Sequence, residues 1–142
     1  MALPLASLIF VALTVGALAE PMPTRRIPCK TAENATTCYW ARGRIMFYNG
    51  TPSYRLWKVG TKRLLGIYSG PSAWHGDPLA SDNENPEMPA NVEKGVSMGP
   101  GIVLWGDFEI CPLVRERPGR MQAACVESAT HLFVQNFNRP SQ

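Results

Sequence analysis

Basic and aromatic side chains alternate along residues 42–48 and 54–59, and they are the residues best suited to bind a ligand. Successive side chains of an extended strand point to opposite faces of a sheet, so one face would carry most of them. Arginine can hold an anionic group, and an aromatic ring can stack on a base or a sugar ring. The candidate ligand-binding residues are Arg42, Arg44, Tyr48, Arg55, Trp57 and Tyr68. No cofactor is expected.

The arginines of this face raise a question of charge. If a two-residue turn after residue 48 joins the two segments, Arg44 lies directly opposite Arg55, and like charges in that position are destabilising. Two acidic residues of a later segment, Asp107 and Glu109, could neutralise the first-segment arginines within the protein. An anionic ligand is the alternative source of negative charge. Both explanations are open at this point.

Catalytic and metal-binding patterns are weak. His131 is expected opposite Trp105 and diagonal to Asp107, as a base with an orienting acid would be, but no serine or threonine in a nucleophile-elbow context accompanies it. The acids Asp107, Glu109 and Glu127 have no specific cation-binding spacing, and no C-x-x-C pair indicates zinc. We therefore expect a protein that is not an enzyme and has no metal site, with a hydrolase as a further alternative.

Four cysteines, an even number, predict disulfides and an oxidising compartment. Cys111 and Cys125 lie at equal distances from Pro118, which begins a Pro-Gly turn. Placing these two cysteines opposite each other also pairs apolar residues across the turn. We therefore expect a Cys111–Cys125 bond that staples a hairpin, with Cys29–Cys38 as the remaining pair.

Five extended segments would position these side chains. In chain order they are residues 42–48, 54–59, 62–68, 102–113 and 121–135. The long connection at residues 69–101 could hold a short helix at 91–96. Apolar residues should face one another across paired strands. This rule pairs Ile45 with Tyr54, Leu56 with Leu65, Leu104 with Leu132 and Ile110 with Val126.

This order of elements predicts an all-β protein, namely a five-stranded antiparallel, partly open barrel of the OB type. The first strand would pair with both the second and the fourth. A small β-sandwich is the alternative. Trp74, in the long connection, is interpreted as a plug for one open end of the barrel. The expected domain boundaries are residues 1–19 for a signal peptide, 20–41 for an irregular arm, 42–137 for a single β-barrel domain that includes the loop at 69–101, and 138–142 for a tail.

The first nineteen residues carry no charged side chain, contain an apolar run from Leu8 to Val15, and end in Ala17-Leu18-Ala19. These are features of a cleavable secretory signal. We expect a secreted or periplasmic protein with no stable membrane span after cleavage, and an uncleaved membrane anchor is the alternative.

Charge is unevenly distributed along the chain. Residues 20–68 hold nine Lys or Arg and two acidic residues. Such a bias can attract an anionic partner, for example an anionic polymer, a glycan or an envelope component, or it can be paired internally. We expect an exported binding module for an anionic ligand or partner. A purely structural or envelope-associated protein without a small ligand is the alternative.

The stretches ARGRIMFYNGTPSYRLWKVGTKRLLGI and WGDFEICPLVRERPGRMQAACVESATHLFV resemble small secreted proteins of Gram-negative bacteria that have no known activity. The likeness lies in residues 42–67 and 105–134. It implies a periplasmic or exported domain, and it brings no activity, ligand or site residues.

Overall fold

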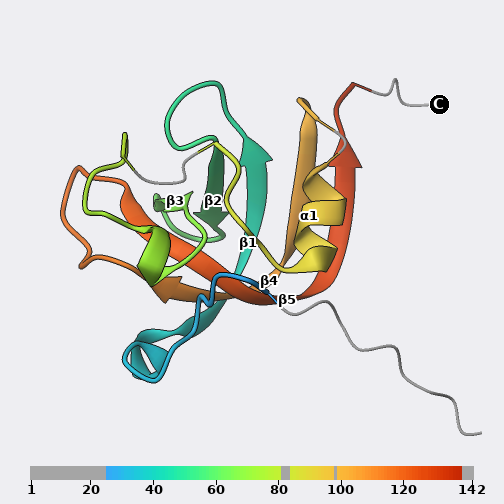
Figure 1. The fold of residues 1–142 in the computed structure, drawn as a ribbon. Coiled ribbons are helices and arrows are strands. Elements are labelled where there is room, and N and C mark those ends of the chain that lie inside the picture. Colours follow the sequence, from blue (N-terminus) through green and yellow to red (C-terminus); the bar gives the residue numbers. More distant parts are fainter. Residues whose placement is uncertain (1–24, 81–83, 98, 139–142) are drawn as a thin grey trace, which may run out of the picture.

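The computed structural model describes residues 25–80, 84–97 and 99–138 (Figure 1). The elements are η1 (Ala35–Thr37), β1 (Tyr39–Phe47), β2 (Tyr54–Lys58), β3 (Leu64–Ile67), η2 (Pro71–Ala73), α1 (Ala90–Val96), β4 (Ile102–Pro112) and β5 (Gln122–Asn136). The expected signal peptide, the start of the arm and the last residues of the tail lie outside the described residues. Among the described residues, no helix is long and apolar enough to cross a membrane.

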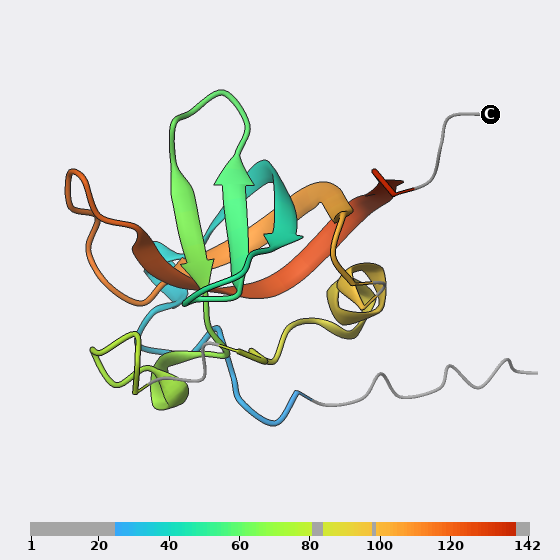
Figure 2. The same cartoon turned by 90° about the horizontal axis from the view of Figure 1, so that it is seen from above.

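The five strands form one mixed sheet that closes on itself in the order β1-β2-β3-β5-β4, with β4 pairing back onto β1 (Figures 1 and 2). We call this closed sheet the ring. The all-β class is confirmed, and so is the pairing of the first strand with both the second and the fourth. The expectation of an entirely antiparallel sheet is wrong, because β3 and β5 are parallel. Strand direction cannot alternate all the way around a closed ring with an odd number of strands, so one neighbouring pair must be parallel.

The register of β1 against β2 differs from the prediction by two residues. Ile45 lies opposite Leu56, and Phe47 lies opposite Tyr54. The connection is longer than a two-residue turn, since it spans residues 48–53 and is closed by a hydrogen bond from the Tyr48 amide to the Ser53 carbonyl, 2.7 Å. A shift of two residues leaves every side chain on its expected face. The predicted pairing of Leu56 with Leu65 is confirmed.

The register of β4 against β5 is as predicted beside the turn and shifts farther away. Cys111 faces Cys125 and Ile110 faces Val126, but Leu104 faces Val134. Two irregularities in the pairing cause the shift, and His131 has a positive φ of 52° beside one of them. As a result, Trp105 faces Phe133 instead of His131, and Glu109 faces Ser128.

The hydrophobic core fills the inside of the ring and the space under α1. Ile45, Leu56, Leu65, Leu104 and Phe108 are all at most 1% exposed. The predicted short helix is present as α1, and its buried residues Val92 and Val96 are four positions apart, so they lie on one face. This face joins the core cluster, and therefore α1 covers the ring where it contacts β1, β4 and β5.

All four cysteines form disulfides, as expected, but the predicted pairing is wrong. Cys29 is bonded to Cys125, and Cys38 is bonded to Cys111. Cys38 directly precedes β1, whose pairing with β4 sets Tyr39 opposite Ile110, so Cys38 continues that register onto Cys111. Both bonds therefore attach the N-terminal arm to the two cysteines that face each other across β4 and β5.

Non-reducing peptide mapping should recover Cys29 with Cys125 and Cys38 with Cys111. Removing the second bond as Cys38→Ala/Cys111→Ala should lower the free energy of unfolding by about 2–5 kcal/mol, because this bond closes a long loop. Urea denaturation measures the loss, and the exposed arm variant Thr36→Ala is a control expected to change stability by less than about 0.5 kcal/mol. A Cys111–Cys125 peptide recovered from folded protein would contradict the pairing.

Candidate ligand-binding site

One predicted arginine, Arg44, lies in a row of side chains that crosses the outward face of the ring. The cross-strand partners in this row are Leu64, Trp57, Arg44, Trp105 and Phe133. The Cζ atom of Arg44 is 5.0 Å from the ring centroid of Trp57 and 5.5 Å from that of Trp105, within cation–π range. Because Arg44 faces Trp57 instead of Arg55, the expected like-charge conflict does not arise. Arg44 is held within the fold by the two indoles.

Arg42 forms the internal ion pair that the sequence allowed. Its Nη1 is 3.4 Å from Asp107 Oδ1, and His131 Nδ1 is 2.9 Å from Asp107 Oδ2. Desolvation raises the pKa of Asp107, but the hydrogen bonds from His131 and Arg42 and the charge of Arg42 outweigh it and hold this pKa below its usual value. Arg42 therefore already has a carboxylate partner.

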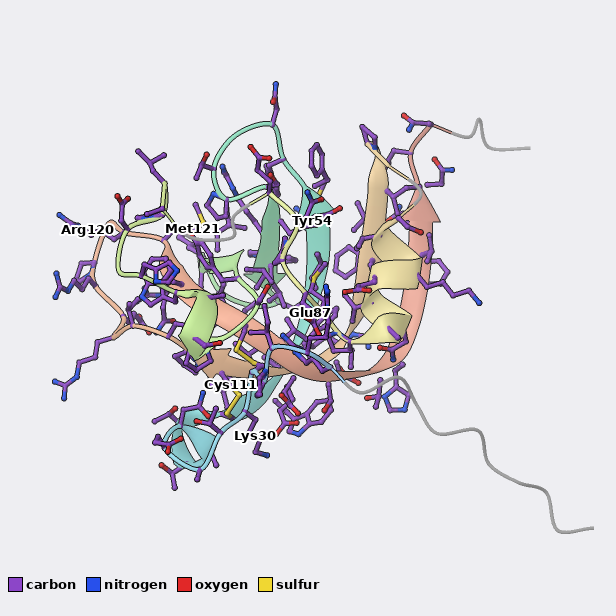
Figure 3. All side chains as sticks on the ribbon, in the orientation of Figure 1. Lys30, Tyr54, Glu87, Cys111, Arg120 and Met121 are labelled. Carbon is purple, nitrogen blue, oxygen red and sulfur yellow. A yellow bond between two sulfur atoms is a disulfide. The ribbon has the colours of Figure 1, made fainter. Side chains whose placement is uncertain are left out.

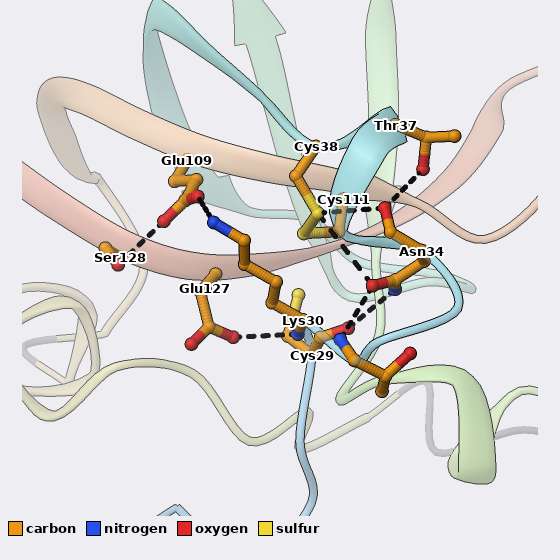
Figure 4. Close-up of polar contacts among 10 residues, drawn as sticks. Cys29, Lys30, Asn34, Thr37, Cys38, Glu109, Cys111, Glu127 and Ser128 are labelled. Carbon is orange, nitrogen blue, oxygen red and sulfur yellow. Dashed lines mark hydrogen bonds and ion pairs between the residues drawn. A yellow bond between two sulfur atoms is a disulfide. The ribbon is translucent and has the colours of Figure 1, made fainter.

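Glu109 does not neutralise an arginine, which corrects one expectation. Its carboxylate is largely buried and lies 2.6 Å from Lys30 Nζ, while Ser128 donates to its other oxygen at 3.0 Å (Figure 4). The hydrogen bond and the charge of Glu109 raise the pKa of Lys30. The Lys30 amide also donates to Glu127 at 2.8 Å. These two acids thus hold the N-terminal arm, beside the disulfides.

The remaining predicted residues fall into two further groups. The guanidinium of Arg55 lies over the ring of Tyr48, 4.7 Å from its centroid, and Arg55 Nε donates to the Pro52 carbonyl at 3.1 Å. These contacts hold the β1–β2 loop. Tyr68 is buried and packs edge-on against Trp74, with centroids 4.7 Å apart. The structure therefore does not bring the six predicted residues together into one site.

A pocket of about 390 Å³ lies on the outward face where β3 meets β5. We call it the arginine pocket. Its described lining residues are Thr51, Pro52, Gly66, Tyr68, Trp74, Gly76, Pro78, Val114, Arg115, Arg117, Arg120, Met121, Gln122 and Ala123. They come from the β1–β2 loop, β3, the segment after β3, the β4–β5 loop and the start of β5. The β4–β5 loop, which supplies the arginines of the pocket, lies on the opposite side of the ring from α1 (Figures 1 and 2).

The floor of the arginine pocket is made of small residues. Gly66 pairs with Ala123 across the parallel strands. A Cβ at Gly66 would come within 2.6 Å of Pro52 Cγ and 3.3 Å of Met121 Sδ, so only glycine lets both side chains approach the sheet here. Figure 3 shows Met121 and Arg120 side by side at this end of the molecule.

One wall of the arginine pocket is aromatic. Trp74 follows the short helix η2, packs on Tyr68 and lines the pocket. It is outside the hydrophobic core, in which Val92 and Val96 of α1 take part. The interpretation of Trp74 as a plug for the end of the barrel is therefore wrong.

The other wall is basic. Arg115, Arg117 and Arg120 project from the β4–β5 loop, and none of their guanidinium groups forms an ion pair with a described residue. The acid within this loop, Glu116, pairs instead with Arg63. No Asp or Glu is among the described lining residues. The wall therefore carries positive charge that forms no ion pair with the described side chains around it.

Sequence reasoning missed this basic wall, although a signal was present. The segment RERPGR at residues 115–120 contains three arginines and one glutamate. Counting charge over residues 102–142 balances these arginines against acids such as Glu109 and Glu127, which the fold uses elsewhere. A shorter counting window would have found the cluster.

Catalytic geometry is not assembled around His131. Thr130 Oγ1, at 3.3 Å, and Asp107 Oδ2, at 2.9 Å, both contact the same ring nitrogen, Nδ1. A general base that is oriented by an acid uses one nitrogen for the acid and the other for the nucleophile. Over the described residues, no group of three or more His, Cys, Asp or Glu could hold a metal ion.

No protein-family model matches the chain, and no match was found among the curated proteins or the solved structures. The function therefore has to be inferred from the geometry of the protein's own side chains. The uncompensated arginines beside an aromatic pair are the arrangement best suited to a ligand.

We expect the stability contributed by Asp107 to be lost on acidification. Its pKa is lowered on folding, so the contribution is present above the ordinary pKa of about 4 and disappears as the pH falls through the folded-state value. In urea denaturation, Asp107→Asn should be less stable than wild type at about pH 5, and the difference should shrink toward about pH 2.5. The exposed-acid variant Glu84→Gln is the control. A difference for Asp107→Asn that does not change with pH would contradict the account.

Proposed function

We propose that the protein is a disulfide-stabilised binding module, not an enzyme, and that its ligand is an anion held in the arginine pocket. The observation that carries this proposal is the set of three guanidinium groups, from Arg115, Arg117 and Arg120, without ion-pair partners among the described residues. Arginine binds phosphate and carboxylate groups through paired N–H donors. An anion in the pocket would supply the missing negative charge.

The topology supports a barrel of the OB type. The strand order β1-β2-β3-β5-β4 closes on β1, and α1 lies between β3 and β4 in the chain. OB barrels bind oligonucleotides and oligosaccharides between the β1–β2 and β4–β5 loops. The arginine pocket takes Pro52 from the first loop and its arginines from the second. This likeness is one of fold, so the ligand is argued from the side chains.

The predicted arginines are a poorer ligand site than the arginines of the β4–β5 loop, because the predicted ones already have partners within the protein. Arg42 has Asp107, Arg44 has two indole rings, and Arg55 has a tyrosine ring and a carbonyl. A ligand binding to these groups would have to compete with contacts that the fold already makes. The loop arginines need no such exchange.

An exported location agrees with the disulfides. Two disulfides are compatible with an oxidising compartment. We propose that the module acts outside the cytoplasm, where its anionic ligand would be found.

Isothermal titration with inorganic pyrophosphate at low salt tests the proposal. Wild-type protein should bind, and Arg117→Gln/Arg120→Gln should weaken binding by about tenfold for each arginine, because charge-assisted hydrogen bonds are lost. The control Lys62→Gln/Lys94→Gln makes the same change in net charge with residues that do not line the pocket, so it should bind nearly as wild type does. Equal losses in both variants would point to net charge alone. No binding by wild-type protein would favour a structural role without a small ligand.

A further inference from the structure

The two walls of the arginine pocket suit two different kinds of ligand group. Trp74, which packs edge-on against the buried ring of Tyr68, presents aromatic surface from the segment after β3, and Met121 adds a polarisable side chain that adapts to flat rings. The arginines of the β4–β5 loop present charge. A simple inorganic anion would leave the aromatic wall uncovered, and an uncharged ring would leave the arginines uncompensated. A ligand that carries both a flat ring and an anionic group satisfies both walls.

The number of arginines favours phosphate over carboxylate as the anionic group. A phosphate monoester carries nearly two negative charges and three acceptor oxygens, so it can accept paired N–H donors from more than one guanidinium. A carboxylate has one charge and two oxygens. Three arginines that line one pocket of about 390 Å³ therefore match a phosphate better. This volume is at the small end of ligand pockets, which suits one ring and one anionic group.

The pocket also offers polar groups to the edge of a ring. Gln122 lines it, and Gln122 Nε2 donates to the Val114 carbonyl at 2.8 Å, which fixes the side-chain amide in place. The amide oxygen of Gln122 accepts no hydrogen bond from a described residue, and an exocyclic amine of a base would supply one. A heteroaromatic base thus suits this pocket better than a plain hydrocarbon ring does.

We infer that the arginine pocket binds a nucleoside phosphate, with the base against Trp74 and Met121 and the phosphate on the arginines of the β4–β5 loop. This inference rests on the proposed function and names its ligand class. The nucleoside phosphate can be free or can be the end of a single strand.

A free nucleotide and the end of a single strand would make different contacts with the surface beside the pocket. Arg55 lies directly across from Gly66, and the next row along the outward face holds Trp57 and Trp105, with the exposed ring of Phe133 at its far end. The bases of a single strand that extends beyond the pocket would reach this row and would exchange the Arg44–indole contacts for stacking on the same rings. A strand would therefore gain affinity with length, whereas a free nucleotide would use the pocket alone.

Titration calorimetry with adenosine, pyrophosphate and adenosine monophosphate (AMP) tests the inference. AMP should bind about tenfold or more tightly than either adenosine or pyrophosphate, because only AMP contacts both walls. If pyrophosphate binds as tightly as AMP, the nucleoside assignment is overturned while the proposed anion-binding function stands. If neither anion binds, the proposed function fails as well. Tighter binding of a heparin-derived disaccharide than of AMP would also overturn the nucleoside assignment.

The variant Trp74→Ala separates the contribution of the aromatic wall to binding from that of the arginines. This variant should lose about tenfold in AMP affinity and keep its affinity for pyrophosphate, since base–aromatic stacking is removed and the arginines are not. Trp74→Phe should restore most of the AMP affinity, which excludes a folding defect as the cause. Trp40→Ala, at an exposed tryptophan outside the pocket, is the matched control and should bind AMP as wild type does. Unchanged AMP affinity in Trp74→Ala would contradict the inference.

The affinities of oligoadenylates of two to about eight nucleotides with a 5′-phosphate show whether the ligand is a free nucleotide or the end of a single strand. Affinity that rises with length, and that falls in Trp57→Ala only for the longer chains, indicates the end of a single strand. Affinity equal to that of AMP at every length indicates a free nucleotide. Oligoadenylates that all bind more weakly than pyrophosphate would contradict the inference for both sources.

Discussion

The short parallel pairing of β3 with β5 is the constraint on which the rest of the structure depends. It involves only the segments Leu65 to Ile67 and Gln122 to Ala124. It closes the ring, and it places Gly66 beside Ala123 as the floor of the arginine pocket. The same pairing brings the β4–β5 loop next to the β1–β2 loop. An open sheet with the same strands would have neither the pocket nor its two chemically different walls.

The N-terminal arm stabilises the closed ring just beyond the last paired residues of β3 and β5. Arg25 donates to the carbonyls of Ser69 and Val126, each two residues beyond a paired segment, and to that of Glu87. Its guanidinium therefore bridges β3 and β5 beyond their last paired residues. Cys29 is bonded to Cys125, the residue next to the pairing. The arm thus holds β3 and β5 together beside their pairing, and its disulfides, ion pairs and arginine hydrogen bonds all act on the same part of the sheet.

Alternation of apolar residues was enough to predict the strands, their faces and the partners of β1, because burial fixes which side of a strand faces the core. Turn geometry and irregular pairing were not predictable in the same way. The loop at residues 48–53 and the irregularity beside His131 shifted both registers and changed the partners of Arg44 and Trp105. The disulfides were missed because pairing was sought within one hairpin, whereas Cys38 continues the β1–β4 register onto Cys111.

The site was harder to predict than the fold, because a pocket forms where distant segments meet. Tyr68 was the one predicted ligand-binding residue that lines it, and Trp74 was interpreted as a plug for one open end of the barrel. Whether Arg115, Arg117 and Arg120 are a binding wall depends on where Glu116 and the other acids point, and only the folded arrangement determines that. Local charge patterns therefore suggest such a site without locating it.

The central claim is that the ligand binds where β3 meets β5 and not on the arginines of β1. Nuclear magnetic resonance of 15N-labelled protein titrated with AMP tests it most directly, because every amide reports its own environment. We predict that the largest shifts fall on Gly66, Met121, Ala123 and the Trp74 indole, with little change at the Trp40 indole. Shifts centred on Arg42 and Arg44, with the Gly66 and Ala123 amides unmoved, would contradict the account.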